Sequence, residues 1–167
     1  MADGQTAGSV LQINVSGGGV PKRPVAEGVV SELGLEGDDH THPELHGGPQ
    51  QALLFIAVEG IEELKNAGFP LFPGALGENV TTLGLDRRTW KIGQRWRVGD
   101  HVVVEFTKMR APCATLNQYG AGLIQKAIYD EMVRGGDPSS PHWGLGGCYA
   151  RVITGGTIHS GDIIRPA

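Results

Sequence analysis

The sequence contains few cysteines and no long hydrophobic run. Of its 167 residues, only Cys113 and Cys148 are cysteines, too few for a disulfide-rich secreted scaffold. The longest apolar run covers residues 52–58, whereas a membrane-spanning helix needs about 20 residues. The N-terminus, MADGQTAGSV, lacks the basic and hydrophobic regions of a signal peptide. We therefore expect a cytoplasmic protein that makes no contact with a membrane.

Charge is also scarce, since 19% of the residues are charged and the formal net charge is -4. The hydrophobic share of 40% with this small net charge favours a folded chain over a disordered one. The absence of a basic excess argues against general nucleic-acid binding. Basic residues nevertheless concentrate in residues 22–23, 87–97 and 108–110, and could converge on an anionic small ligand. The alternative is a solvated surface of mixed charge.

Glycine, by contrast, is abundant: the 27 glycines are more than twice the usual share of about 7%. They follow no Gly-X-Y period, so we place most of them in turns between short elements. The length favours a single domain over residues 1–167, with residues 1–9 as a flexible N-terminal tail.

Short apolar runs between turn residues indicate mostly strands. The predicted strands cover residues 10–15, 25–33, 52–56, 78–83, 90–98, 101–107, 149–154, 156–159 and 163–165. Helical periodicity is found at residues 58–67 and 123–133. We expect a mainly β fold, a closed or partly open antiparallel β-barrel with two or three peripheral helices. Within it, residues 149–154 and 156–159 would form a hairpin.

Cys113 is the first candidate for chemistry. It follows a predicted strand in the segment Lys108-Met109-Arg110-Ala111-Pro112-Cys113. Lys108 and Arg110 would favour the thiolate, which attacks electrophiles and binds soft metals. A small buried hydrophobe is the alternative role for a free cysteine.

Three further segments carry weaker signals: the histidine-rich residues 40–46, the glycine-rich residues 17–23, and the pair Glu78 and Asn79. His40, His42 and His46 could bind zinc, or simply belong to a polar loop. The glycine-rich segment 17–23, which ends in Lys22 and Arg23, could hold a phosphate, although it does not match a P-loop.

Glu78 and Asn79 lie between a Pro/Gly loop and a predicted strand, where an asparagine can cap a loop or donate to a ligand.

Taken together, these segments resemble the MOSC domain, named for the C-terminal domain of molybdenum cofactor sulfurases. The resemblance runs from about residue 16 to 166. Within this family, the sequence resembles the bacterial MOSC proteins that reduce hydroxylaminopurine. The matching stretches are 18–25 (GGVPKRPV), 34–38 (GLEGD), 46–48 (HGG), 73–79 (PGALGEN), 110–113 (RAPC) and 149–152 (YARV).

The resemblance implies a barrel-like fold and a molybdenum cofactor (molybdopterin) whose metal is ligated by Cys113. The cofactor would be contacted by Lys22, Arg23, His46, Gly48, Asn79, Thr81 and Arg110. Glu78, or a histidine of the 40–46 loop, would deliver protons during reduction of a small N-hydroxylated substrate.

The resemblance also implies partners and alternatives. A reductase of this size needs a separate electron-donor protein, and a sulfur carrier with a persulfide on Cys113 needs a sulfur donor. Complete sulfurases bind pyridoxal phosphate in a further domain, which would not fit in 167 residues. A zinc hydrolase that uses His40, His42 and His46 is the third hypothesis, and a homodimer is compatible with each of them.

Overall fold

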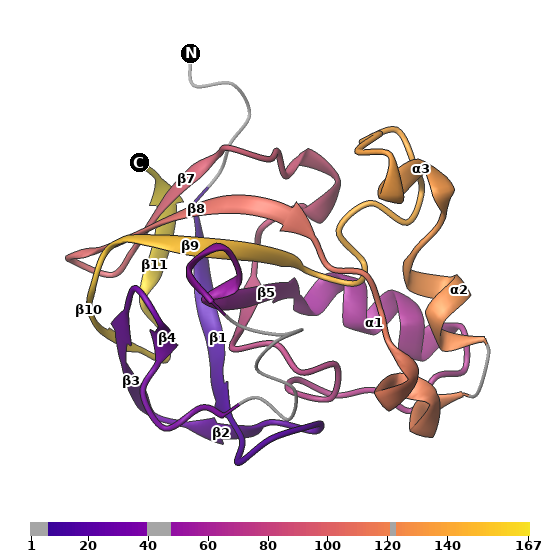
Figure 1. Ribbon diagram of the computed structural model, residues 1–167, viewed down its shortest axis with the longest axis horizontal. Helices are drawn as coiled ribbons and strands as arrows, with labels where there is room; N and C mark the ends of the chain where they lie inside the picture. Colours follow the sequence, from indigo (N-terminus) through magenta and orange to yellow (C-terminus); the bar gives the residue numbers. More distant parts are fainter. Residues whose placement is uncertain (1–6, 40–47, 121–122) are drawn as a thin grey trace.

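The computed structural model describes residues 7–39, 48–120 and 123–167 (Figure 1). Within these ranges, seven strands form a closed barrel, because the last strand in the spatial order given next also pairs with the first. In spatial order they are β1 (Gly8–Val15), β6 (Val80–Leu83), β5 (Leu53–Ala57), β9 (Cys148–Thr154), β8 (Val102–Met109), β7 (Arg95–Val98) and β11 (Ile163–Pro166). The predicted β-barrel is thereby confirmed.

The other elements surround this barrel. Strand β2 (Arg23–Val25) extends the sheet beyond β1, and a small sheet contains β10 (Gly156–His159), β3 (Glu27–Ser31) and β4 (Gly34–Leu35). The helices are α1 (Val58–Asn66), α2 (Ile124–Ile128) and α3 (Glu131–Arg134), with 3-10 turns η1 (Pro49–Gln51), η2 (Arg87–Thr89) and η3 (Ala114–Tyr119). Figure 1 shows the helices gathered at one end of the barrel.

The barrel sheet is mixed, because β5 and β6 run parallel while the other described barrel pairings are antiparallel. Parallel neighbours require a crossover connection, which α1 provides. No helix of the described residues is long and apolar enough to cross a membrane.

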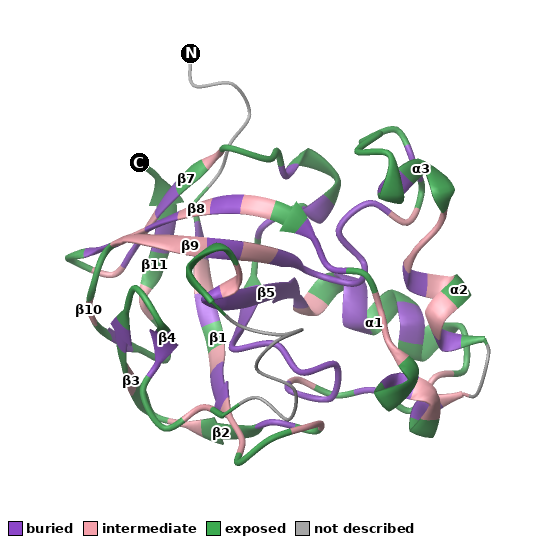
Figure 2. Ribbon diagram, viewed as in Figure 1, coloured by how far each residue is buried: buried purple, intermediate pink, exposed green. Residues whose placement is uncertain are grey.

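Two apolar clusters form the core (Figure 2). In the barrel, Phe106 packs against Phe55 and Trp90 with ring centroids 5.6 and 5.1 Å apart. The second cluster lies between the barrel and the helices, and includes Ile61 of α1 and Ile128 of α2. From the segment between β8 and α2, Leu116 and Tyr119 belong to this second cluster.

The single helix predicted over residues 123–133 is wrong. The chain forms α2 and α3, and Tyr129 between them is extended, with φ −157° and ψ 142°. The Asp130 carboxylate accepts a hydrogen bond from the Val133 N–H at 2.8 Å. A carboxylate at this capping position satisfies an N–H that has no partner within the helix, and so favours a new helix start.

The hairpin predicted between residues 149–154 and 156–159 is also wrong, because β10 pairs with β3 of the small sheet. The chain leaves the barrel at Gly155, whose position would bring an added Cβ to 2.6 Å from the Val30 carbonyl oxygen. Glycine is required for this close approach. The strand predicted over residues 25–33 is correspondingly split, since β2 pairs with β1 and β3 with β10.

At the N-terminus, β1 begins at Gly8, and Gly8 pairs with Ile164 of β11. Gly8 and Ser9 are therefore part of the barrel, not of the predicted tail. Residues 1–6 lie outside the described residues.

Candidate functional site

Cys113 lies just after β8, at the start of the 3-10 turn η3. Its side chain is half-buried, and its Sγ lies 2.8 Å from Thr115 Oγ1. Cys148, by contrast, is fully buried on β9, and burial raises the pKa of its thiol. Of the two thiols, Cys113 is the one that a ligand can reach.

Arg110 lies three residues before Cys113 and is buried. Its Nε donates to the Gly146 carbonyl at 2.8 Å, and its backbone N–H donates to Gly147. Its Nη2 has no hydrogen-bond partner among the described residues. Burial lowers the pKa of Arg110, while the charges of Tyr149, Glu78 and Cys113 act in the opposite direction.

Glu78 is fully buried at the end of the 73–77 loop. Its Oε2 accepts hydrogen bonds from the Gly74 N–H at 3.0 Å and the Thr81 hydroxyl at 2.8 Å. Its Oε1 has no partner in the described part of the chain. Desolvation raises the pKa of Glu78, and it outweighs these hydrogen bonds and the charge of Arg110. The environment therefore favours a carboxyl group that holds its proton.

The 73–77 loop, which leads into Glu78, packs closely against the Lys22 segment because residue 74 is glycine. Gly74 has φ +94°, and an added Cβ would lie 2.3 Å from the Lys22 carbonyl oxygen. The Gly74 carbonyl also accepts a hydrogen bond from the Lys22 N–H at 2.9 Å. This glycine thereby joins the Lys22 segment to the loop that positions Glu78.

Tyr119 is a further candidate for the site that the sequence did not indicate. It ends η3, six residues after Cys113, and its ring is buried. Its hydroxyl makes no hydrogen bond to any described residue. Burial raises the pKa of Tyr119, and the charge of Glu78 raises it further. A tyrosine in a predicted loop carries no periodicity or motif, so only the fold places it here.

A second polar network surrounds Asp38. Lys22 Nζ contacts both Asp38 carboxylate oxygens, at 2.6 and 2.5 Å, and the Asn79 amide donates to Asp38 at 2.8 Å. Asn79 Oδ1 accepts from the Leu54 N–H, and Thr81 also binds the Asn14 amide. Both Asn79 and Thr81 are therefore engaged in fixing the loops.

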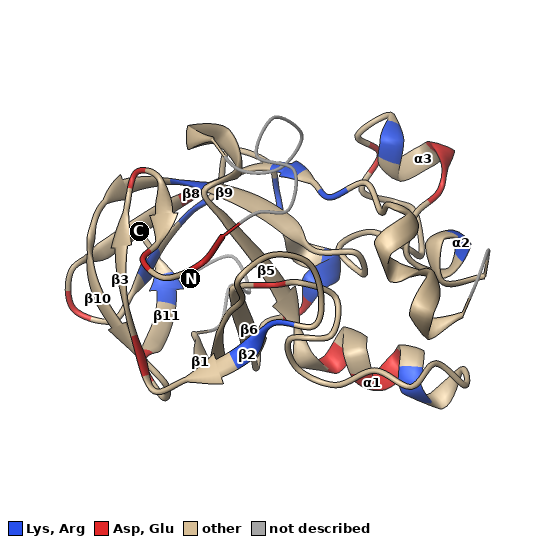
Figure 3. Cartoon of the chain, turned by 60° about the horizontal axis from the view of Figure 1, so that its bottom comes forward, with Lys and Arg blue, Asp and Glu red and all other residues tan. Residues whose placement is uncertain are grey.

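The other predicted contact residues are dispersed. Arg23 is exposed at the start of β2, which Figure 3 shows as a basic segment beside the barrel. Gly48 is exposed with φ +82°. His40, His42 and His46, on which the zinc hypothesis depends, lie outside the described residues. In the ranges that are described, no group of three His, Cys, Asp or Glu side chains could hold a metal ion.

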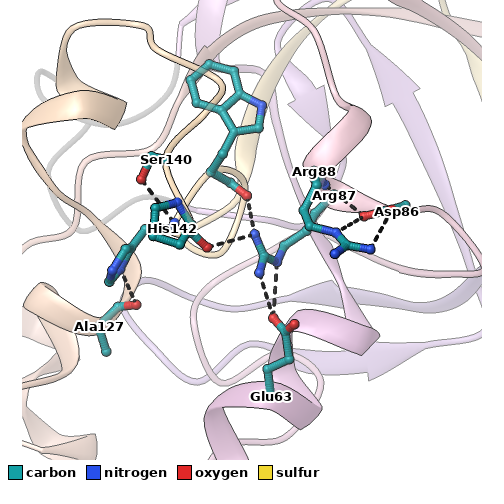
Figure 4. Close-up of polar contacts among 9 residues, drawn as sticks. Glu63, Asp86, Arg87, Arg88, Ala127, Ser140 and His142 are labelled. Carbon is teal, nitrogen blue, oxygen red and sulfur yellow. Dashed lines mark hydrogen bonds and ion pairs between the residues drawn. The ribbon is translucent and has the colours of Figure 1, made fainter.

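Arg87 holds the segment that supports Arg110, and Figure 4 shows its contact with Glu63. It is buried and donates from Nη1 to the carbonyls of Pro141 and Trp143, the latter at 2.5 Å. Its Nε and Nη2 donate to Glu63 of α1 at 3.2 and 2.8 Å. The segment held in this way continues to the Gly146 carbonyl that binds Arg110.

The reachable thiol and the buried acidic, cationic and phenolic groups are linked by their charges. Cys113 and Glu78 affect the pKa of Arg110, and Glu78 affects that of Tyr119. Glu78 Oε1, Arg110 Nη2 and Tyr119 Oη are buried polar atoms without partners among the described residues, where five other side-chain atoms also lack partners. Buried polar atoms are ordinarily hydrogen-bonded, so three exceptions that also act on one another favour a ligand site. The Cys113 thiol adds a soft metal ligand or a nucleophile.

Comparison with known proteins gives a family match and several relatives. A family model described as the MOSC domain matches residues 42–165. Protein YiiM of Escherichia coli (strain K12) is 34% identical over 99 residues, which cover 54% of this chain and 42% of YiiM. Uncharacterized protein YflK of Bacillus subtilis (strain 168) is 31% identical over 147 residues, covering 86% and 60% of the two chains. This chain therefore matches less than two thirds of the length of these relatives.

Solved structures share the fold. YiiM from Geobacillus stearothermophilus has a TM-score of 0.68 at 24% identity, covering 96% of this chain and 75% of that chain. YuaD from Bacillus subtilis has a TM-score of 0.69 at 16% identity, covering 96% and 95%.

Proposed function

The chain belongs to the MOSC domain family, and on this premise we propose that it binds a molybdenum cofactor and reduces N-hydroxylated bases or related N-oxygenated compounds. The family is associated with molybdenum cofactor binding. The observation that carries the proposal is the half-buried Cys113 thiol next to unpartnered, buried polar atoms of Arg110, Glu78 and Tyr119.

These residues fit such a cofactor by their chemistry. A thiolate is a soft, anionic ligand suited to a high-valent metal-sulfur centre such as that of the cofactor. The free Nη2 of Arg110 can donate to an anionic or carbonyl oxygen, and Glu78 and Tyr119 can bond the polar edge of a pterin. Together they would satisfy groups that otherwise stay buried without partners.

Each residue then has a role. Cys113 Sγ would ligate the metal, and Arg110 would hold an anionic part of the cofactor. The bound cofactor would supply the two-electron chemistry that removes oxygen from the substrate. Glu78, whose pKa is raised by burial, would hold the proton that the leaving oxygen needs.

Lys22, Arg23, His46, Gly48, Asn79 and Thr81 are proposed as further contacts of the cofactor. The Lys22 charge is balanced by Asp38, so its contribution to an anion site would be weaker than that of Arg110. A separate electron-donor protein would reduce the site after each turnover.

The test is the molybdenum and pterin content of protein purified from a host that makes the cofactor. We expect about one molybdenum per chain in the wild type and a loss of at least about tenfold in Cys113→Ala. Cys148→Ala is the control, because it removes the other thiol and should retain the metal. Equal metal in Cys113→Ala and the wild type would refute the assignment.

The same thiol supports one other function, a sulfur carrier with a persulfide on Cys113. Its half-buried position leaves the thiol open to a donor protein. A metal-free protein that gains 32 Da on Cys113 after incubation with a cysteine desulfurase, a gain expected from the mass of one sulfur atom, would favour this role over reduction.

A further inference from the structure

A groove lies beside the candidate site and has no part in the functions proposed above. Its volume is 340 Å³, close to the lower end of the range for small-molecule sites. Its lining includes Lys108, Met109, Ala111, Arg134 and Tyr149. We call it the Lys108 groove.

The charged side chains of the groove are positive, as in a site that binds an anion. Lys108 and Arg134 are the charged side chains among its described lining residues, and both are exposed. Arg134 has only a loose contact with Glu131, at 3.7 Å, and both of these side chains are mostly exposed. Lys108 lies over the ring of Tyr149, with Nζ 5.8 Å from the ring centroid. The groove therefore combines two accessible cations with an aromatic wall.

A second cavity provides the contrast. It has a volume of 380 Å³ beside α1, and it contains three acidic side chains as well as Arg87 and Arg88. Those arginines are already paired, Arg88 with Asp86 at 3.0 Å and Arg87 with Glu63 at 2.8 Å. Only the Lys108 groove of the two has cations in excess.

The groove and Cys113 are neighbours along the chain. The groove's lining includes Ala111, two residues before Cys113, and two extended residues span at most about 7 Å. Tyr149 links the two places: its ring faces Lys108, while the charges of Arg110 and Cys113 affect the pKa of its hydroxyl, which burial raises. This short separation favours a substrate that reaches from Cys113 to the groove.

We propose that the Lys108 groove binds the phosphate of a nucleotide, so that the substrate is an N-hydroxylated nucleoside monophosphate rather than the free base. This rests on the proposed function. Lys108 and Arg134 would pair with the phosphate, and the Tyr149 ring would contact the sugar or base. Such binding remote from the reacting atoms lowers KM and leaves kcat nearly unchanged.

The first experiment measures binding alone, by calorimetry on the purified protein with adenosine 5′-monophosphate, adenosine and inorganic phosphate. We expect the nucleotide to bind at least about tenfold more tightly than either fragment. Lys108→Ala and Arg134→Ala should each weaken it about threefold to fivefold, which is typical of one exposed charge pair. Arg88→Ala is the matched control and should have no effect. No binding, or equal losses in Lys108→Ala and Arg88→Ala, would overturn the proposal.

The second experiment measures turnover of N6-hydroxyadenosine and its 5′-monophosphate by the cofactor-loaded protein. We expect a higher kcat/KM for the monophosphate through KM, and Arg134→Glu should abolish this preference while activity on the nucleoside persists. Equal kcat/KM in the wild type would refute the groove as a substrate site. If neither compound is reduced while the nucleotide still binds at Lys108, the reductase proposal fails and the anion site stands.

Discussion

Glu78, Arg110 and Tyr119 lower the stability of the folded chain when no ligand is bound. Each buries a polar atom that makes no hydrogen bond to another described residue. One such atom costs about 1–3 kcal/mol. Residues that weaken the fold in this way are explained if a ligand completes their hydrogen bonds, which is the role proposed for them.

Glu78→Gln should alter how stability depends on pH. The pKa of Glu78 is raised in the folded chain above its ordinary value of 4.5 by burial. Between these two pKa values the unfolded chain binds fewer protons, so the stability of the wild type falls as pH rises. Glutamine retains an acceptor for Gly74 and Thr81 but has no proton to lose. Urea unfolding at pH 5 and pH 8 should show Glu78→Gln gaining stability relative to the wild type at the higher pH. A stability difference that is the same at both pH values would mean that Glu78 titrates normally.

Tyr119→Phe should separate ligand binding from folding. It removes a hydroxyl that has no partner in the described structure and leaves the buried ring in place. Without cofactor, we expect a gain of about 1 kcal/mol, or about 2–4 °C in Tm. The same variant should retain less molybdenum than the wild type. A Tm several degrees below that of the wild type would instead show that the hydroxyl supports the fold.

At the scale of residues, the sequence indicates a candidate site residue where the type of side chain and its neighbours determine the chemistry. Cys113 is a candidate because it follows a strand and has neighbouring cations, and Glu78 because it lies between a loop and a strand. Tyr119 was not found, because a buried and unpartnered hydroxyl is a property of the packing. Nor does the sequence show that Asp38 balances the charge of Lys22, sixteen residues away.

At the scale of elements, the segment between α3 and β9 shows how a loop is made rigid. Residues 140–146 have little regular structure, yet most of them are buried. Arg87 binds two of their carbonyls, and Trp143 Nε1 donates to the Trp90 carbonyl at 2.8 Å. The loop can therefore present the Gly146 carbonyl to Arg110 in one position.

Arg87→Ala should loosen this loop. It would leave the buried carbonyls of Pro141 and Trp143 without their donor, at a cost of about 3 kcal/mol. Glu63→Ala removes only the other side of the ion pair and should cost less than about 1 kcal/mol, because the Glu63 side chain is 57% exposed. Urea unfolding gives both values, and hydrogen exchange at the Arg110 N–H reports on the loop. Equal costs for the two variants would show that the ion pair matters more than the carbonyl contacts.

The elements themselves were predicted best where one rule governs them. On β8, Val102, Val104 and Phe106 alternate along the strand, and all three are buried. Prediction failed where local and distant interactions compete. The apolar stripe of residues 123–133 favoured one helix, but the Asp130 cap started another. Likewise, sequence proximity paired β10 with β9, whereas the available edge was that of β3.

For the whole molecule, the decisive contact joins the two ends of the chain. Gly8 and Ser9 of β1 pair with Ile164 and Ile163 of β11, and this pairing closes the barrel. A closed barrel has no free edges at which other chains could add strands. The composition predicted many turns and short strands, but no local pattern states which two strands meet last.

Two neighbouring residues of β11 test how much closure contributes. Ile164 is fully buried in the barrel cluster, whereas Ile163 is 52% exposed. Ile164→Ala should cost about 2–5 kcal/mol, because it leaves a cavity where β1, β7 and β11 meet. Ile163→Ala should cost less than about 1 kcal/mol, although it removes the same atoms from the same strand. Thermal unfolding followed by near-UV and far-UV circular dichroism checks both, and we expect one coincident transition in each variant. If Ile164→Ala instead gave two separate transitions, the barrel and the helical cluster would fold as independent units, and closure by β11 would stabilise only the barrel.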